Sequence, residues 1–153
     1  MLKSIEGNFD NPEVNELLTK HFIELRAASP EGSAHVLDIP GLKVSSIKFW
    51  SLWENDKIFG CGALKFLDKD HGEFKSIRVA DDFRKKGMGA KIINHLIIES
   101  KKLNIIRVSV ETGAGDFFLP ARKLFKKFKF IECPPFAHYK EDPNSCYFTL
   151  KLL

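Results

Sequence analysis

The sequence lacks any long uninterrupted apolar run. No window of its 153 residues approaches the roughly 18 apolar residues that a membrane-crossing helix needs. The first six residues also lack the basic segment and apolar stretch of a secretory signal. We therefore expect a soluble cytoplasmic protein that has no membrane partner.

Cysteine is scarce as well. Cys61, Cys133 and Cys146 are an odd number with no paired spacing. Neither a disulfide framework nor a four-ligand zinc site is suggested by this pattern. We expect buried, reduced thiols and no metal cofactor.

Signs of disorder, internal repeats and linkers are missing too. Hydrophobic residues make up 44% of the chain, and 14 of them are Phe. That much apolar surface can offset the entropy of ordering a chain of this length. The sequence predicts one domain over residues 1–153.

Positive charge is present and unevenly placed, although the net charge is only +4. Two clusters carry much of it: Arg84, Lys85, Lys86 and Lys91, and then Arg122, Lys123, Lys126, Lys127 and Lys129. Solvated helix faces, a nucleic-acid footprint or an anionic cofactor lying between the clusters would each account for them. Nucleic acid is the poorest of these interpretations because aromatic platforms do not alternate with the basic residues.

Apolar periodicity predicts alternating helices and strands. Three helices are expected, over Asn11 to Ala28, Gly89 to Leu103 and about Phe117 to Phe128, the last capped by Asp116. Strands are expected over Ile47 to Trp53, Ile58 to Phe66, Glu73 to Val79, Ile106 to Val110 and Cys146 to Leu152. A loop or short helix is expected around Ile39 to Gly41.

One strand, loop, helix and strand follow each other between Glu73 and Val110. In a single sheet this order implies a right-handed parallel crossover, with its ligand at the carboxyl ends of the strands. Gly87 and Gly89 lie where the strand leads into the helix. They would let a ligand approach the unpaired helix amides, and the helix dipole favours an anion there.

Two common phosphate motifs do not fit this turn. A Walker loop needs Lys and then Ser or Thr after its glycine, and Met88 follows Gly87. A dinucleotide fingerprint needs a third glycine, and Ile92 occupies that position.

What remains is Arg84-Lys85-Lys86-Gly87-Met88-Gly89, with Val79 five positions upstream. This segment resembles the acetyl-CoA pyrophosphate loop of the GNAT superfamily of N-acetyltransferases. The order of elements is similar to that fold over nearly the whole chain, and Ala121, Leu124 and Phe130 are placed as in its last helix and the strand that follows. The segments Trp50 to Trp53 and Pro120 to Leu124 further resemble those of a bacterial subgroup labelled indole-3-acetic acid acetyltransferases.

The resemblance implies an α/β fold, α+β in some schemes. Its mixed central sheet would have about six or seven strands and about four helices. The N-terminal part of the sheet would be antiparallel. A parallel pair of strands would splay apart and hold the acetyl thioester in the gap.

The resemblance also implies acetyl-CoA as cosubstrate. Backbone amides from Lys85 to Ala90 would hold the pyrophosphate, and main-chain groups of Ile77 to Val79 would meet the pantetheine arm, with the Val79 amide polarising the thioester carbonyl. The full set of implied cofactor-binding residues is Ile77, Arg78, Val79, Arg84, Lys85, Lys86, Gly87, Met88, Gly89, Ala90, Phe118 and Arg122.

The implied reaction is direct attack of a primary amine on the thioester within a ternary complex. Because an ammonium must first lose a proton, the reaction needs a base. Glu73 lies eleven residues before Arg84, the spacing at which the histone-acetyltransferase branch places its glutamate base. The alternative interpretation of Glu73 is a solvated residue at a strand start.

The sequence departs from the family where many members use a Tyr to protonate the departing thiolate, because Phe125 occupies that position. Lys129 also replaces a common Gly, and Phe118 stands where an Asn is frequent. No other donor is needed if the departing thiolate takes its proton from solvent; otherwise a different side chain donates it. The third alternative is a sensor domain that binds acyl-CoA without turnover.

Tyr139 is the second catalytic candidate, because its loop could fold over the acceptor pocket. It would donate to the thiolate or position the amine, whereas the alternative is an exposed aromatic that anchors a long loop. His71 and His138 are expected to be surface residues. The acceptor, a small molecule or a peptide, and a homodimeric state are left open by the sequence.

Overall fold

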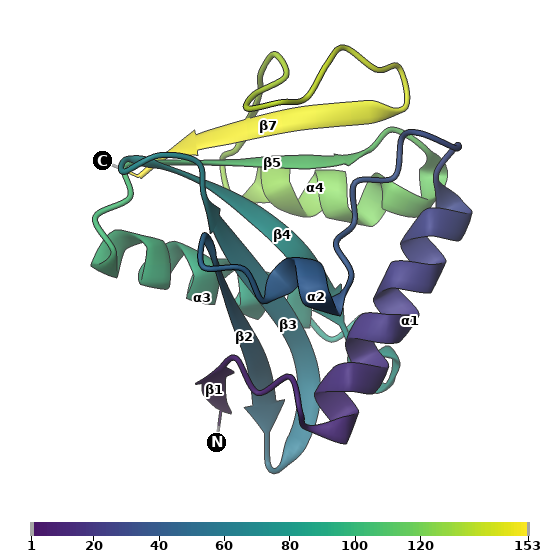
Figure 1. The fold of residues 1–153 in the computed structure, drawn as a ribbon, viewed down its shortest axis with the longest axis vertical. Coiled ribbons are helices and arrows are strands. Elements are labelled where there is room, and N and C mark those ends of the chain that lie inside the picture. The colour runs from purple at the N-terminus through teal and green to yellow at the C-terminus, as the bar shows by residue number, and fades with distance from the viewer. Residues whose placement is uncertain (1, 153) are drawn as a thin grey trace.

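The computed structural model describes residues 2–152, and Figure 1 shows one twisted sheet between helices. The seven strands are β1 (Leu2–Glu6), β2 (Ile47–Glu54), β3 (Lys57–Phe66), β4 (His71–Val79), β5 (Arg107–Gly113), β6 (Ile131–Glu132) and β7 (Ser145–Lys151). The helices are α1 (Pro12–Ala28), α2 (Ile39–Leu42), α3 (Met88–Lys102) and α4 (Leu119–Lys127), with short 3-10 turns at Asp81–Phe83 and Asp116–Phe118. The sheet order is β1-β2-β3-β4-β5-β7-β6, and β4 and β5 are its parallel pair.

Helices cover both faces of the sheet (Figure 1). On one face α1 and α2 bury Val14, Leu17, Leu18 and Leu42 against Trp53 and Phe49 of β2 and Cys61 of β3. On the other face α3 and α4 bury a larger cluster that includes Ile92, Leu96, Phe125 and Phe74. The sheet is apolar on both faces as a result. This explains why apolar and polar residues alternate over only part of β4.

Local sequence signals set the helix ends as expected. The Asn11 side chain accepts hydrogen bonds from the amides of Glu13 and Val14, and Pro12 stands in the first turn of α1. Asn104 has φ 62 just after α3, the left-handed conformation predicted for it.

The aromatic residues Trp50, Trp53 and Phe49 of β2 are buried in the core.

Three expectations need correction. Asp116 does not cap the last helix, because α4 follows a 3-10 turn and its N-cap, Phe118, makes no side-chain hydrogen bond. The edge strand β1 was not predicted, and β6 was implied only by the resemblance that places Phe130 at a strand, since most residues of both strands are exposed and carry no alternating apolar face. Of the three unpaired cysteines, only Cys61 is fully buried.

The parallel pair opens into a gap. Pairing between β4 and β5 covers only His71 to Glu73 against Arg107 to Ser109, although β4 continues to Val79 and β5 to Gly113. A bulge in β4 lies just beyond, where Ser76 and Ile77 stand opposite Gly62 of β3, and Ser76 has φ 54. The mixed sheet with a splayed parallel pair is therefore confirmed.

Across residues 2–152, no helix combines the length and the apolar character needed to cross a membrane. The cytoplasmic location, the single domain over residues 1–153 and the homodimer stay predictions.

Candidate active site

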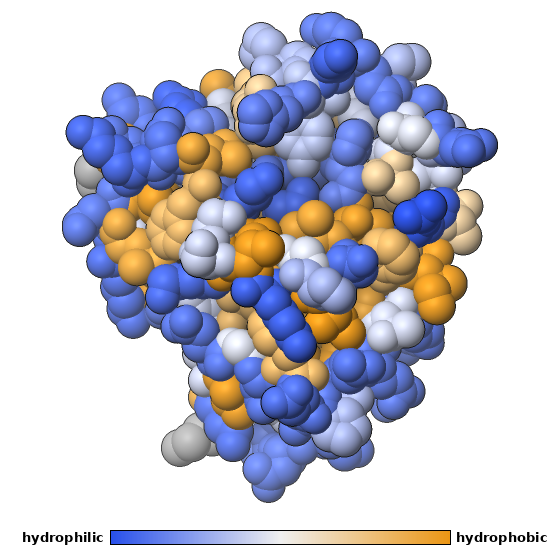
Figure 2. Space-filling view, viewed as in Figure 1, coloured by the Kyte–Doolittle hydropathy of each residue, from blue (hydrophilic) through white to orange (hydrophobic). Residues whose placement is uncertain are grey.

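A cavity of about 540 Å³ occupies the gap between β4 and β5. Its walls come from α1 and the α1–α2 connection on one side, and from the ends of α3 and α4 on the other. On the face shown in Figure 2, hydrophobic side chains gather near the middle around a few polar ones. A cavity of this size accommodates a small organic ligand.

The N-terminus of α3 lies at one end of this cavity. Gly87 is the N-cap, with φ 77, and makes no side-chain capping bond. The amides of the first helical turn therefore remain free to bind an anion, which the helix dipole also favours. Gly87, Met88 and Gly89 all line the cavity, as their predicted role requires.

The basic residues before the helix are exposed, but they are not equally free. Lys85 has φ 62 and lines the cavity, and Lys86 lies over the ring of Phe83 at 5.7 Å. Arg84 is held by Asp81, with 3.1 Å between its Nε and the carboxylate, and lies 3.8 Å from Glu24. Phosphate contacts by these side chains stay predictions.

The edge of β4 that faces the gap offers main-chain groups. The amide of Ala80 donates to the Phe59 carbonyl of β3 at 2.8 Å. Because successive residues of a strand turn their amides to opposite sides, the Val79 N–H points away from β3, toward the gap. Ile77 and Val79 line the cavity there, whereas the Arg78 side chain is 5% exposed and pairs with Glu24 of α1 at 3.0 Å.

Two predicted cofactor residues follow β5. Phe118 lines the cavity and packs on Gly113, where an added Cβ would lie only 2.2 Å from the Phe118 ring. Arg122 instead donates to the carbonyls of Gly113 and Gly115, at 2.7 and 2.8 Å, and does not line the cavity. Arg122 thus shapes the loop that carries Phe118, and its phosphate contact stays a prediction.

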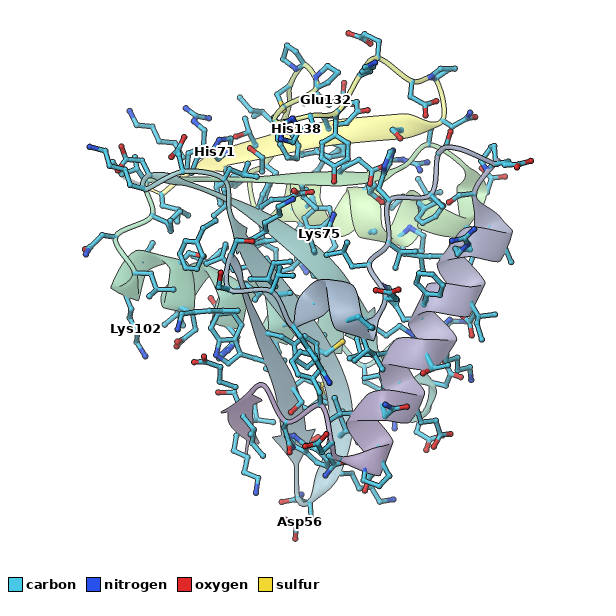
Figure 3. The ribbon with its side chains drawn as sticks, viewed as in Figure 1. Asp56, His71, Lys75, Lys102, Glu132 and His138 are labelled. Atoms are coloured by element: carbon cyan, nitrogen blue, oxygen red, sulfur yellow. The ribbon has the colours of Figure 1, made fainter. Side chains whose placement is uncertain are left out.

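At the other end of the cavity, the structure brings the two catalytic candidates together. Tyr139 donates its hydroxyl to Oε2 of Glu73 at 2.5 Å, and Lys75 Nζ contacts the same carboxylate at 3.3 Å and the Tyr139 hydroxyl at 3.1 Å. Figure 3 shows Lys75 over the sheet, beside the α1–α2 connection. Glu73 is only 2% exposed, so it is not a solvated edge residue.

Burial and the Glu73 carboxylate both raise the pKa of Tyr139 far above its ordinary value, burial having the larger effect. The phenol therefore stays protonated. Burial likewise raises the pKa of Glu111, which lines the same cavity and accepts a hydrogen bond from Ser145 at 2.8 Å.

The predictions for the two histidines had different outcomes. His138 is exposed, as expected. His71 is half-buried and lies 2.7 Å from the Ser109 hydroxyl, at the point where β4 and β5 still pair. It is therefore wrong to describe His71 as a plain surface residue.

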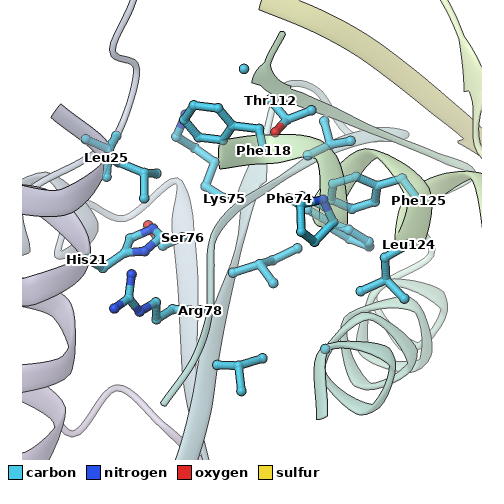
Figure 4. Close-up of a pocket in the computed structure, with 18 of the residues that line it drawn as sticks. His21, Leu25, Phe74, Lys75, Ser76, Arg78, Thr112, Phe118, Leu124 and Phe125 are labelled. Atoms are coloured by element: carbon cyan, nitrogen blue, oxygen red, sulfur yellow. The ribbon is translucent and has the colours of Figure 1, made fainter. Parts of the chain in front are cut away.

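Sequence reasoning missed several polar residues that line the cavity, and Figure 4 labels four of them: His21, Lys75, Ser76 and Thr112. The fifth is Glu111. His21 had a detectable signal, because it follows Leu17 and Leu18 on the apolar stripe of α1 at helical spacing. Ser76 had none, since only its pairing with β3 reveals the bulge.

The model of the Acetyltransferase (GNAT) family matches residues 12–130, which include this cavity's strands and the α3 N-terminus. The chain belongs to the GNAT acetyltransferase family. Among curated GNAT relatives, the uncharacterized N-acetyltransferase YsnE of Bacillus subtilis is 44% identical over 92% of this chain and 93% of its own. The uncharacterized N-acetyltransferase YedL of Escherichia coli is 37% identical over 93% and 89%. The prediction of a GNAT N-acetyltransferase is therefore confirmed.

More distant relatives match as well, and solved structures share the fold. The IAA acetyltransferase of Azospirillum brasilense is 27% identical over 77% of this chain and 76% of its own, in line with the subgroup that the sequence resembles. A GNAT acetyltransferase structure from Staphylococcus aureus has a TM-score of 0.73, 21% identity and full coverage of both chains. One from Elizabethkingia anophelis, with acetyl-CoA bound, has a TM-score of 0.70 and 17% identity over 98% and 97%.

Proposed function

We propose that this enzyme moves an acetyl group from acetyl-CoA to a primary amine by direct attack in a ternary complex. One observation carries the proposal: a single cavity joins the uncapped N-terminus of α3 to the buried carboxylate of Glu73, through the gap between β4 and β5. An anion site and a proton acceptor at opposite ends of one cavity suit a ligand with a phosphate end and a reactive end.

The cofactor half of the cavity suits acetyl-CoA. The pyrophosphate would bind the amides of Gly87 to Ala90. The pantetheine arm would lie against the open edge of β4, where the Val79 N–H points into the gap. That N–H would polarise the thioester carbonyl and stabilise the negative charge that develops on its oxygen during attack.

Glu73 is the proposed base. Both donors that hold it, Tyr139 and Lys75, bind Oε2. An acceptor ammonium that reaches Oε1 would give its proton to Glu73, directly or through a water molecule, and attack as the neutral amine.

Tyr139 would position Glu73 and the amine. Its raised pKa makes the phenol a poor proton donor to a thiolate, because unperturbed thiols ionise more readily, with pKa values near 8.5. The proton that completes CoA would then come from the amine that has just formed the amide, carried by Glu73 or by solvent.

A second candidate is a sensor that binds acyl-CoA without turnover. Phe125 favours it, because this ring lines the cavity and packs between Phe130 and Phe148, where no hydroxyl is available. Under this alternative, acetyl-CoA would bind tightly and no amine would accelerate thiol release.

Thiol release from acetyl-CoA, measured over a panel of primary amines, tests the proposal. We expect turnover by the natural chain and a loss of about 100-fold or more in kcat for Glu73→Gln, with acetyl-CoA affinity kept. Glu132→Gln, which changes an exposed carboxylate on β6, is the matched control and should keep full rate. Full turnover in Glu73→Gln would show that Glu73 is not the base. Binding of acetyl-CoA without turnover by the natural chain would favour the sensor.

A further inference from the structure

Three polar atoms on one wall of the cavity have no hydrogen-bond partner within residues 2–152. They are Nδ1 of His21, Oγ of Ser76 and Nε of Arg78, and all three residues line the cavity. Figure 4 shows them side by side, across the cavity from Phe118 and Leu124. His21 and Arg78 are 4% and 5% exposed. Unpaired polar atoms carry a free-energy penalty, so this arrangement indicates a ligand group that pairs with them.

These atoms lie on the acceptor face rather than the cofactor face. Arg78 and Ser76 project toward α1, where His21 resides, whereas α3 and α4 pack on the opposite face of the sheet. Glu73 and Lys75 of the same strand also face this side, toward Tyr139 and the α1–α2 connection. The subsite and the proposed base therefore flank one acceptor space.

The electrostatics around the subsite suit an anion. Burial, and secondarily the charge of Arg78, lower the pKa of His21 to about 4, so His21 is neutral and able to donate one hydrogen bond. The nearby ion pairs join Lys20, Arg78 and Arg84 with only two carboxylates, those of Glu24 and Asp81. One further carboxylate would balance these charges, and Ser76, His21 and Arg78 supply three donors for it.

The other end of the acceptor space suits a cation. Glu73 and Glu111 both line it, and Lys75 is the cation bonded to Glu73. Two linked segments also roof the space: Ser33 of the α1–α2 connection donates to Asp142 at 2.7 Å, and Lys75 donates to the His35 carbonyl at 3.3 Å. Such a roof favours a small acceptor over the surface of a folded protein.

We propose that the acceptor is a small amino acid whose amine meets Glu73 and whose carboxylate binds His21, Ser76 and Arg78. This assignment rests on the proposed acetyl transfer. Three residues of extended strand, a span of roughly 10 Å, separate Glu73 from Ser76. The amine and the carboxylate are therefore separated by several carbons, as in an ω-amino acid.

Matched acceptors test the assignment: 6-aminohexanoate, its amide, hexylamine and the shorter 4-aminobutyrate. We expect kcat/KM for 6-aminohexanoate to exceed that for hexylamine and for the amide by at least about tenfold, as a charge-assisted hydrogen bond gives. His21→Leu and Ser76→Gly should abolish this preference, leaving hexylamine turnover and acetyl-CoA affinity within about twofold. Glycine is chosen because it tolerates φ 54 at position 76.

His95→Leu is the matched control. His95 Nε2 is also buried without a partner, but this residue lies on α3 against Trp50 and does not line the cavity. It should keep the carboxylate preference. Equal rates with 6-aminohexanoate and hexylamine, or a loss of acetyl-CoA affinity in His21→Leu, would overturn the assignment.

Failure of the proposed function gives a different result. If acetyl-CoA binds and no amine is acetylated, calorimetry with the CoA-saturated protein still decides the subsite. Tighter binding of 6-aminohexanoate than of hexylamine, lost in His21→Leu, would support the carboxylate subsite, and equal binding would reject it.

Discussion

The Tyr139 hydroxyl donates a 2.5 Å hydrogen bond to Oε2 of Glu73, although 66 positions separate the two residues in the sequence. A loop after α4 thus completes a site that begins on β4. Phe136 and Tyr147 hold the Tyr139 ring at centroid distances of 5.1 and 5.7 Å, so the donor is fixed by packing.

Removing this donor should slow the reaction. Tyr139→Phe keeps the ring and deletes one hydrogen bond to a buried carboxylate, an interaction of about 1.5–3 kcal/mol, so we expect kcat to fall roughly 10- to 100-fold. Steady-state kinetics on a responsive amine measures this effect. His138→Ala, in the neighbouring exposed position, should keep the natural rate, and an unchanged kcat in Tyr139→Phe would exclude a positioning role.

Acid should destabilise the protein through His21. Its folded pKa of about 4 lies below its ordinary value of 6.5. Between these values the unfolded state binds the proton more tightly, so the free energy of unfolding falls as the pH falls through this window. From pH 7 to pH 5, we expect this residue to account for a loss of about 2 kcal/mol.

Urea unfolding of the natural chain and of His21→Leu at both pH values measures this loss. Other buried or paired groups respond to acid in both proteins, so the informative quantity is the difference between the two losses. His21→Leu should lose about 2 kcal/mol less than the natural chain over this interval. Parallel pH dependences would show that folding does not lower the pKa of His21.

Gly87 should serve cofactor binding through its backbone conformation. An added Cβ meets nothing within 4 Å, but φ is 77, so Gly87→Ala strains the turn by about 1–2 kcal/mol without a clash. We expect both a lower free energy of unfolding and an acetyl-CoA dissociation constant raised about tenfold or more. Gly7→Ala has the same open surroundings at φ 72 in the turn between β1 and α1, outside the cavity lining, and should lose stability with unchanged acetyl-CoA affinity.

Lys129 offers a stabilising change. This residue follows α4 with φ 73, a conformation that a side chain disfavours, and it is exposed. Lys129→Gly should raise the free energy of unfolding by about 1 kcal/mol. Thermal unfolding measures the gain, and Lys123→Gly, at an exposed position in the middle of α4, should destabilise by about the same amount.

The sequence by itself determined the elements whose signals are local. Asn11 and Pro12 begin α1, Asn104 ends α3, and the two glycines open α3 toward an anion, because each effect depends on a few neighbouring residues. The order of these elements, together with the resemblance of the loop from Arg84 to Gly89, predicted the fold. Glu73 could be predicted from its spacing, although its burial could not.

Only the tertiary structure decided how the acceptor half is built. Tyr139 reaches Glu73 because β7 returns beside β5, and Ser76 turns toward His21 because a bulge shifts the register of β4 against β3. Arg122 donates a hydrogen bond to the Gly113 carbonyl at the end of β5. The charge pattern of the sequence does not reveal this interaction. These outcomes depend on register, strand separation and the packing of segments distant in sequence, and such contacts leave no periodic trace in the chain.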